Sequence, residues 1–165
     1  MQILTNNKWI FFIVGLFGGF VYPPFNVYYP ILSVIFLSIY LSYMLVQIDT
    51  SKSARQAFNR MFWLSEISYI ISFNWLMKPF FFIPENIILL LLLAPLSLFI
   101  FSAFLGLFVE FSAVIAYKVS ENKRYFAFAL SIAFFEWVRS WIFTGFPWNQ
   151  FSLVWSNIPS VLQSL

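Results

Sequence analysis

Two charged side chains, Glu136 and Arg139, lie three residues apart in an apolar run that ends in Thr-Gly-Phe-Pro-Trp at residues 144–148. On a helix this spacing places both groups on one face, within reach of each other. A charge in hydrocarbon costs about 2.5–3.5 kcal/mol on insertion scales, so two unpaired charges would cost about 5–7 kcal/mol. We therefore expect the two side chains to have partners or a function. Trp137 and Trp141, four residues apart, stack on a neighbouring face of the same helix.

The chain contains no cysteine and no histidine, which excludes several kinds of chemistry. Thiol nucleophiles, disulfides, imidazole bases and Cys/His zinc sites all require one of these residues. We expect neither a metal site nor a cofactor. The net charge of +3 is small and lies mostly in short loops, so it indicates membrane topology and not a nucleic-acid interface.

The composition predicts an all-α membrane protein with a single transmembrane helical domain over residues 1–165. Hydrophobic residues make up 62% of the chain and charged residues 9%, against about 25% charged in ordinary soluble domains. A soluble domain of this size could not cover so much apolar surface, whereas a lipid bilayer does so directly.

Apolar runs separated by proline-rich or basic turns divide the chain into five predicted transmembrane helices. These spans are at about residues 9–22, 31–48, 61–77, 86–117 and 125–143, and a periplasmic surface tail follows at 144–165. Seven basic residues fall in loops on one side: Lys8, Lys52, Arg55, Arg60, Lys118, Lys123 and Arg124. Only Lys78 falls in a loop on the other side, so the N-terminus is predicted to be cytoplasmic and the C-terminus periplasmic.

Two further acidic residues fall inside predicted spans. Glu66 lies about a turn inside the third span, where it is either a functional acid or a buried partner for a positive or polar group on another helix. Glu110 lies towards the cytoplasmic end of the fourth span, and we expect it at solvent or headgroup level. Gly15, Gly18 and Gly19 in the first span predict a close helix contact.

The segments 136–141 (Glu-Trp-Val-Arg-Ser-Trp) and 144–148 (Thr-Gly-Phe-Pro-Trp) together resemble the fifth-span signature of bacterial apolipoprotein N-acyltransferases. The Tyr-Pro-Pro-Phe turn at 22–25 and Asn74-Trp75 also fit that family. The resemblance implies a multi-pass protein of the bacterial inner membrane. Such enzymes transfer an acyl chain from a phospholipid to the N-terminal cysteine of an apolipoprotein. It also implies catalysis by a Glu, a Lys and a Cys of a periplasmic nitrilase-like domain.

None of those three catalytic residues maps onto this sequence, which ends before such a domain would begin. We therefore expect the membrane part of the enzyme, truncated or split and inactive alone, with a separate nitrilase-like chain as a candidate partner. Phospholipid and the apolipoprotein are the other expected partners. The alternative is a non-enzymatic membrane remnant or a helix–helix interaction protein.

The candidate site follows from the position of the signature at the outer end of the fifth span. Five residues are predicted to line a lipid-accessible cleft there: Glu136, Arg139, Trp141, Thr144 and Trp148. Arg139 could pair with Glu136 or with a phosphate headgroup, because a guanidinium suits both. The alternative is ordinary helix packing, with a satisfied ion pair and interfacial aromatic residues.

Overall fold

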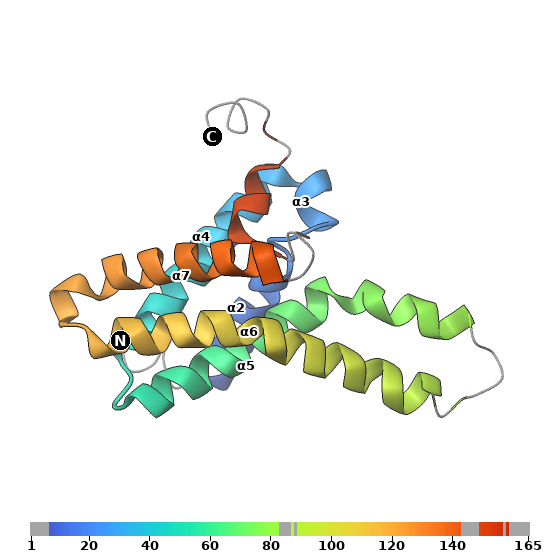
Figure 1. Ribbon diagram of the computed structural model, residues 1–165. Helices are drawn as coiled ribbons and strands as arrows, with labels where there is room; N and C mark the ends of the chain where they lie inside the picture. Colours follow the sequence, from blue (N-terminus) through green and yellow to red (C-terminus); the bar gives the residue numbers. More distant parts are fainter. Residues whose placement is uncertain (1–6, 83–86, 88, 143–148, 157, 159–165) are drawn as a thin grey trace.

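The computed structural model describes residues 7–82, 87, 89–142, 149–156 and 158, and within these ranges the chain is helical and has no strand. The predicted all-α class is therefore confirmed. Each of the longer helices overlaps one of the five apolar segments named above. They are α2 (Lys8–Gly19), α4 (Pro30–Asp49), α5 (Ala54–Ser72), α6 (Ala94–Lys118) and α7 (Arg124–Ile142). In Figure 1, α6 lies between α5 and α7, and α2 and α4 lie behind them.

Length and composition allow two helical stretches of the described chain to cross a membrane. These are α4, with 20 residues, and Leu91–Lys118, with 28. The apolar helix α2 is shorter, with 12 residues. Asn7 caps its start, and the Asn7 side chain accepts a hydrogen bond from the backbone N–H of Trp9 at 2.9 Å. Pro30 is the first residue of α4, where its missing N–H costs nothing.

The helix α5 starts earlier than the predicted span at 61–77, and it also ends earlier than that span does. Ser53 caps its start by accepting a hydrogen bond from the N–H of Gln56 at 3.1 Å, so the polar residues after it are already helical. Beyond Ser72 the chain continues as a 3₁₀ helix, η1 (Asn74–Phe82), which contains Pro79. Proline lacks the N–H that an α-helix interior needs, which explains why α5 does not extend through this segment.

Within the fourth predicted span, a π-helical turn leads directly into an α-helix. A π-helical turn, η2 (Leu89–Leu93), precedes α6, and Pro95 is the second residue of α6. A short 3₁₀ turn, η3 (Glu121–Lys123), then leads into α7. The start of α7 is tied to the end of α4, because Arg124 Nη1 lies 3.2 Å from Asp49 Oδ1.

The core forms where α5 packs between α2 and α6. The predicted close contact of the first helix is present, since its three glycines face α5. A Cβ added at Gly15 would lie 2.8 Å from Ile67 Cγ2, and one added at Gly19 would lie 2.6 Å from Ile71 Cβ. Larger residues at either position would push α2 away from α5. After α7, the helix η4 (Phe151–Trp155) returns to the bundle beside the short helix α3 (Phe25–Tyr28) (Figure 1).

Candidate functional site

Arg139 lies near the end of α7 with its guanidinium bound inside the protein. The residue is only 2% exposed. Nη1 donates a hydrogen bond to Tyr69 Oη on α5 at 3.1 Å, and Nη2 donates to the carbonyl oxygen of Asn149 at 3.2 Å. The guanidinium carbon also lies 5.9 Å from the centre of the Phe108 ring on α6. Arg139 therefore connects α7 to α5, α6 and the chain that follows α7.

Glu136 lies three residues before Arg139 and binds the same following stretch of chain. Its Oε1 accepts a hydrogen bond from the backbone N–H of Phe151 at 2.6 Å. Gln150 Nε2 donates to the backbone carbonyl of Glu136 at 3.1 Å. Glu136 and Arg139, both within the described residues, form no direct ion pair. Because the two residues share a helix face, both bind the segment that follows α7, but each binds different atoms of it.

We call residues 149–155 the return segment, because they bring the chain back onto the bundle. Asn149 has a φ of 42°, in the left-handed region, which asparagine adopts more readily than most residues. Its Nδ2 donates a hydrogen bond to Ser72 Oγ at 2.6 Å. The ring of Phe151 lies 6.0 Å from that of Tyr22 and 6.4 Å from that of Tyr40. Polar bonds and aromatic packing thus fix the chain directly after residues 143–148.

The structure brings two of the five predicted site residues together and sets a third apart. Glu136 and Arg139 face the return segment, whereas Trp141 is 73% exposed and lies beside Trp137, with ring centres 6.1 Å apart. Thr144 and Trp148 lie outside the described residues. The cavity between Glu136, Arg139 and the surrounding rings measures about 10 Å³, the space of one water at most. In this conformation Arg139 therefore acts as an anchor for the chain.

The sequence prediction missed the partners of the two charged residues. Tyr69, which binds Arg139, and Ser72, which binds Asn149, both lie on α5, and no local pattern connects them to α7 or to the return segment. Asn149 carried a weak signal, since an asparagine after an aromatic and proline-containing turn is a candidate for the left-handed region. That signal predicts a turn, but it does not predict that Arg139 binds the carbonyl oxygen.

Glu66 and Glu110 form a second buried polar group, and the expectation that Glu110 is solvated is wrong. Glu110 is fully buried and accepts a hydrogen bond from Ser65 Oγ at 3.4 Å. A Cβ added at Gly106 would lie 2.9 Å from both Glu110 Oε1 and Ser65 Oγ, so this glycine lets α5 cover the carboxylate. Glu66 is 1% exposed, and neither of its carboxylate oxygens has a hydrogen-bond partner among the described residues.

Comparison with known proteins supplies the family. A family model described as the apolipoprotein N-acyltransferase N-terminal domain matches residues 14–165. The chain belongs to this family. It is similar to an apolipoprotein N-acyltransferase of Rickettsia bellii, with 31% identity over 158 residues, which cover 93% of this chain and 29% of that protein. The corresponding protein of Brucella melitensis is 26% identical over 174 residues, which cover 99% of this chain and 32% of the relative.

The chain therefore spans about a third of the length of these apolipoprotein N-acyltransferases. No solved structure matches it significantly. Family membership confirms the resemblance drawn from segments 136–141 and 144–148. Within this apolipoprotein N-acyltransferase N-terminal domain, the charged residues of the signature hold the return segment against the bundle.

Proposed function

We propose that this chain is the membrane part of an apolipoprotein N-acyltransferase of the bacterial inner membrane. The observation that carries the proposal is the match of the N-terminal domain model over residues 14–165. In this proposal the complete enzyme transfers an acyl chain from a phospholipid to the N-terminal cysteine of an apolipoprotein. The five long helices cross the membrane, with the N-terminus in the cytoplasm and the return segment on the periplasmic side.

The apolar exterior of the bundle supports the membrane assignment. Large hydrophobic side chains stand exposed on α4, α6 and α7, among them Ile31 (75%), Leu96 (50%), Phe126 (73%) and Trp141 (73%). Soluble monomers rarely expose contiguous apolar patches of more than a few hundred Å². Lipid acyl chains would cover these side chains without requiring a protein partner.

The position of the two basic loops supports the proposed topology. The loop before α5 carries Lys52, and the loop before α7 carries Lys123. The 3.2 Å contact between Asp49 and Arg124 brings the two loops to the same end of the bundle, at the left of Figure 1. A positively charged end of this kind fits the cytoplasmic side of a membrane protein.

The nucleophile for acyl transfer comes from outside these 165 residues. Acyl transfer through a thioester needs a thiolate, and the chain has no cysteine. We place that thiol in a nitrilase-like domain on the periplasmic side, carried by another stretch of chain or by a separate chain. The contribution of this chain is then a lipid-accessible cleft around Glu136, Arg139, Trp141, Thr144 and Trp148. By holding the return segment in place, Glu136 and Arg139 would form one wall of this cleft.

Acylation of a diacylated lipoprotein peptide tests this function. Membranes would contain the chain alone, the part of the Rickettsia bellii relative that this chain does not cover, or both expressed together. We expect N-acylation only with both. No acylation with both, from stably inserted protein, would favour a non-enzymatic remnant or a helix–helix interaction protein. Acylation by the chain alone would contradict the proposal, because no residue of the chain could form the thioester.

A further inference from the structure

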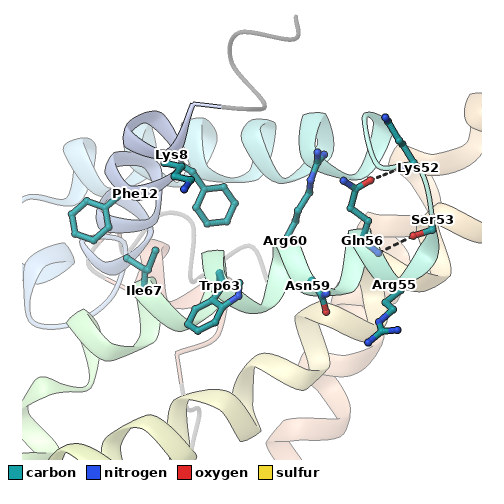
Figure 2. A pocket seen from close by; sticks show the side chains of 11 residues that line it. Lys8, Phe12, Lys52, Ser53, Arg55, Gln56, Asn59, Arg60, Trp63 and Ile67 are labelled. Atoms are coloured by element: carbon teal, nitrogen blue, oxygen red, sulfur yellow. Dashed lines mark hydrogen bonds between the residues drawn. The ribbon is translucent and has the colours of Figure 1, made fainter.

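A basic groove lies at the other end of the bundle from the return segment. It has a volume of about 860 Å³ and is formed by the start of α2, the loop before α5 and the first turns of α5 (Figure 2). Further along the two helices, Gly15 brings α2 against Ile67 of α5. The residues before Gly15 are large, among them Phe11 and Phe12, so the helices do not close on each other there. The groove is the space that remains.

Among the residues that the structure describes, the charged ones along the groove are all positive. They are Lys8, Lys52, Arg55 and Arg60. Arg60 is held in place, since its Nη1 donates to Gln47 O at 3.2 Å and to Thr50 Oγ1 at 3.0 Å. Within the described part of the chain, the side chains of Lys8, Lys52 and Arg55 are exposed and have neither a hydrogen bond nor an ion pair. The groove therefore has positive charge available for an anion.

The N-terminus of α5 adds to this positive end. It is a helix of 19 residues whose first turn opens into the groove at Ser53 and Gln56. The partial positive charge of a helix N-terminus favours an anion nearby. Asp49, the acidic residue at the end of α4, is engaged by Arg124 at 3.2 Å and Tyr125 at 2.7 Å. It is thus not the counter-ion of the groove.

The groove changes from charged to apolar along α5. Arg55, Asn59, Trp63 and Ile67 follow one another at four-residue spacing, so they form a row along the helix. From Arg55 to Ile67 this row is about 18 Å long at helical rise. Figure 2 shows Trp63 between Asn59 and Ile67, with Phe12 across from Ile67 on α2. Trp63 is 55% exposed and Phe12 47%, so both have surface left to cover.

We propose that this groove binds one anionic phospholipid. Its headgroup lies at the end of the groove that carries Lys52 and Arg55, and its glycerol region lies at Gln56 and Asn59. An acyl chain runs over Trp63 towards Ile67, where Lys8 lies beside Phe12. A free phosphate ion would leave the apolar half of the groove empty, which is why a lipid is the better occupant. Basic pockets between transmembrane helices on the cytoplasmic side are suited to anionic headgroups. The inference rests on the proposed membrane insertion, but it is independent of acyl transfer.

Lipid binding to the purified full chain tests the inference. The chain would be prepared in zwitterionic detergent and titrated with phosphatidylglycerol or with phosphatidylcholine of the same acyl chains, and native mass spectrometry would count the bound lipids. We expect one phosphatidylglycerol to bind about tenfold or more tightly than phosphatidylcholine. Each removed charge is worth about fivefold in affinity at a membrane surface, so Lys52→Gln with Arg55→Gln should weaken binding about 30-fold.

A matched variant distinguishes lipid binding in the groove from a general effect of positive surface charge. Lys118→Gln with Lys123→Gln removes the same charge from the other basic loop, and we expect it to change phosphatidylglycerol affinity less than about threefold. Equal losses in both double variants would overturn the proposal, because binding would then follow net charge alone. Asn59→Asp keeps the side-chain volume and adds a negative charge in the groove, so it should also weaken binding. Circular dichroism of each variant checks that the helices are intact.

The apolar half of the site has its own test. Trp63→Ala should weaken phosphatidylglycerol binding, whereas Trp137→Ala, which removes a similarly exposed tryptophan on α7, should not. Displacement of the lipid by inorganic phosphate at millimolar concentration would show that the groove is an anion site without lipid character, which contradicts the proposal. Preferential binding of an acidic peptide over phosphatidylglycerol would assign the groove to a protein partner and would likewise overturn it.

Discussion

Replacing Arg139 with methionine should release the return segment from the end of α7. The substitution removes the donors to Tyr69 Oη and to the carbonyl oxygen of Asn149, at 3.1 Å and 3.2 Å. A hydrogen bond to a charged group contributes about 1.5–3 kcal/mol. Two such bonds would contribute about 3–6 kcal/mol, and loss of the desolvation penalty of a buried guanidinium offsets part of this. We therefore expect the packed position of the return segment on the bundle to become about 2–4 kcal/mol less stable relative to its released position.

Amide hydrogen exchange of peptides covering residues 149–156 measures this loss directly. A loss of about 2–4 kcal/mol corresponds to exchange that is faster by roughly 30-fold to 1,000-fold if local opening controls it. Arg139→Lys keeps the charge but loses the two-pronged geometry, so its effect should be intermediate. Arg55→Met is the matched control, because Arg55 is exposed and has no partner in the described part of the chain.

The refuting result is also specific. Unchanged exchange over residues 149–156 in Arg139→Met, with α5 and α7 still protected, would show that the two hydrogen bonds do not hold the return segment. Arg139 would then have to be explained by a ligand, and the phosphate headgroup considered from the sequence would become the first candidate.

Three further outcomes follow from the packing. Gly18→Ala should lower the unfolding temperature, because the new Cβ would lie 2.6 Å from Tyr40 Cε2 and overpacking costs about 1–3 kcal/mol; an unchanged value would contradict the close contact of α2. Glu66→Leu should raise stability in a denaturant titration by about 1 kcal/mol or more, since it removes a buried carboxylate without a partner in the described residues. Arg124→Gln should lower stability by about 0.5–1 kcal/mol through loss of its contact with Asp49, and the difference should shrink at high salt.

The sequence could predict the helices because their causes are local. Apolar runs, divided by prolines and basic turns, indicated all five long helices. The start of α5 was predicted less well. Ser53 extends that helix back into a polar stretch that hydropathy alone assigns to a loop. A cap depends on one side chain, so a pattern averaged over many residues misses it.

The shared face of Glu136 and Arg139 could be predicted from the sequence, but the bonds of these two residues could not. The spacing of Glu136 and Arg139 indicated a shared face, and the structure uses that face to hold a single segment. The partner Tyr69 comes from a distant helix, whose position depends on the packing of the whole bundle. The burial of Glu110 could not be predicted for the same reason. It depends on the close contact with α5 that Gly106 allows, and not on the position of Glu110 along its helix.

The most direct test of the account is the side of the membrane on which the two ends of α7 lie. The chain has no cysteine, so single cysteines can be introduced without background, at Ser152 in the return segment and at Asn122 in the loop before α7. Both positions are exposed. In intact spheroplasts, Ser152→Cys should react with a membrane-impermeant thiol reagent, and Asn122→Cys should react only after permeabilisation. The reverse pattern, or reaction at both positions without permeabilisation, would contradict the topology on which the proposed enzyme function depends.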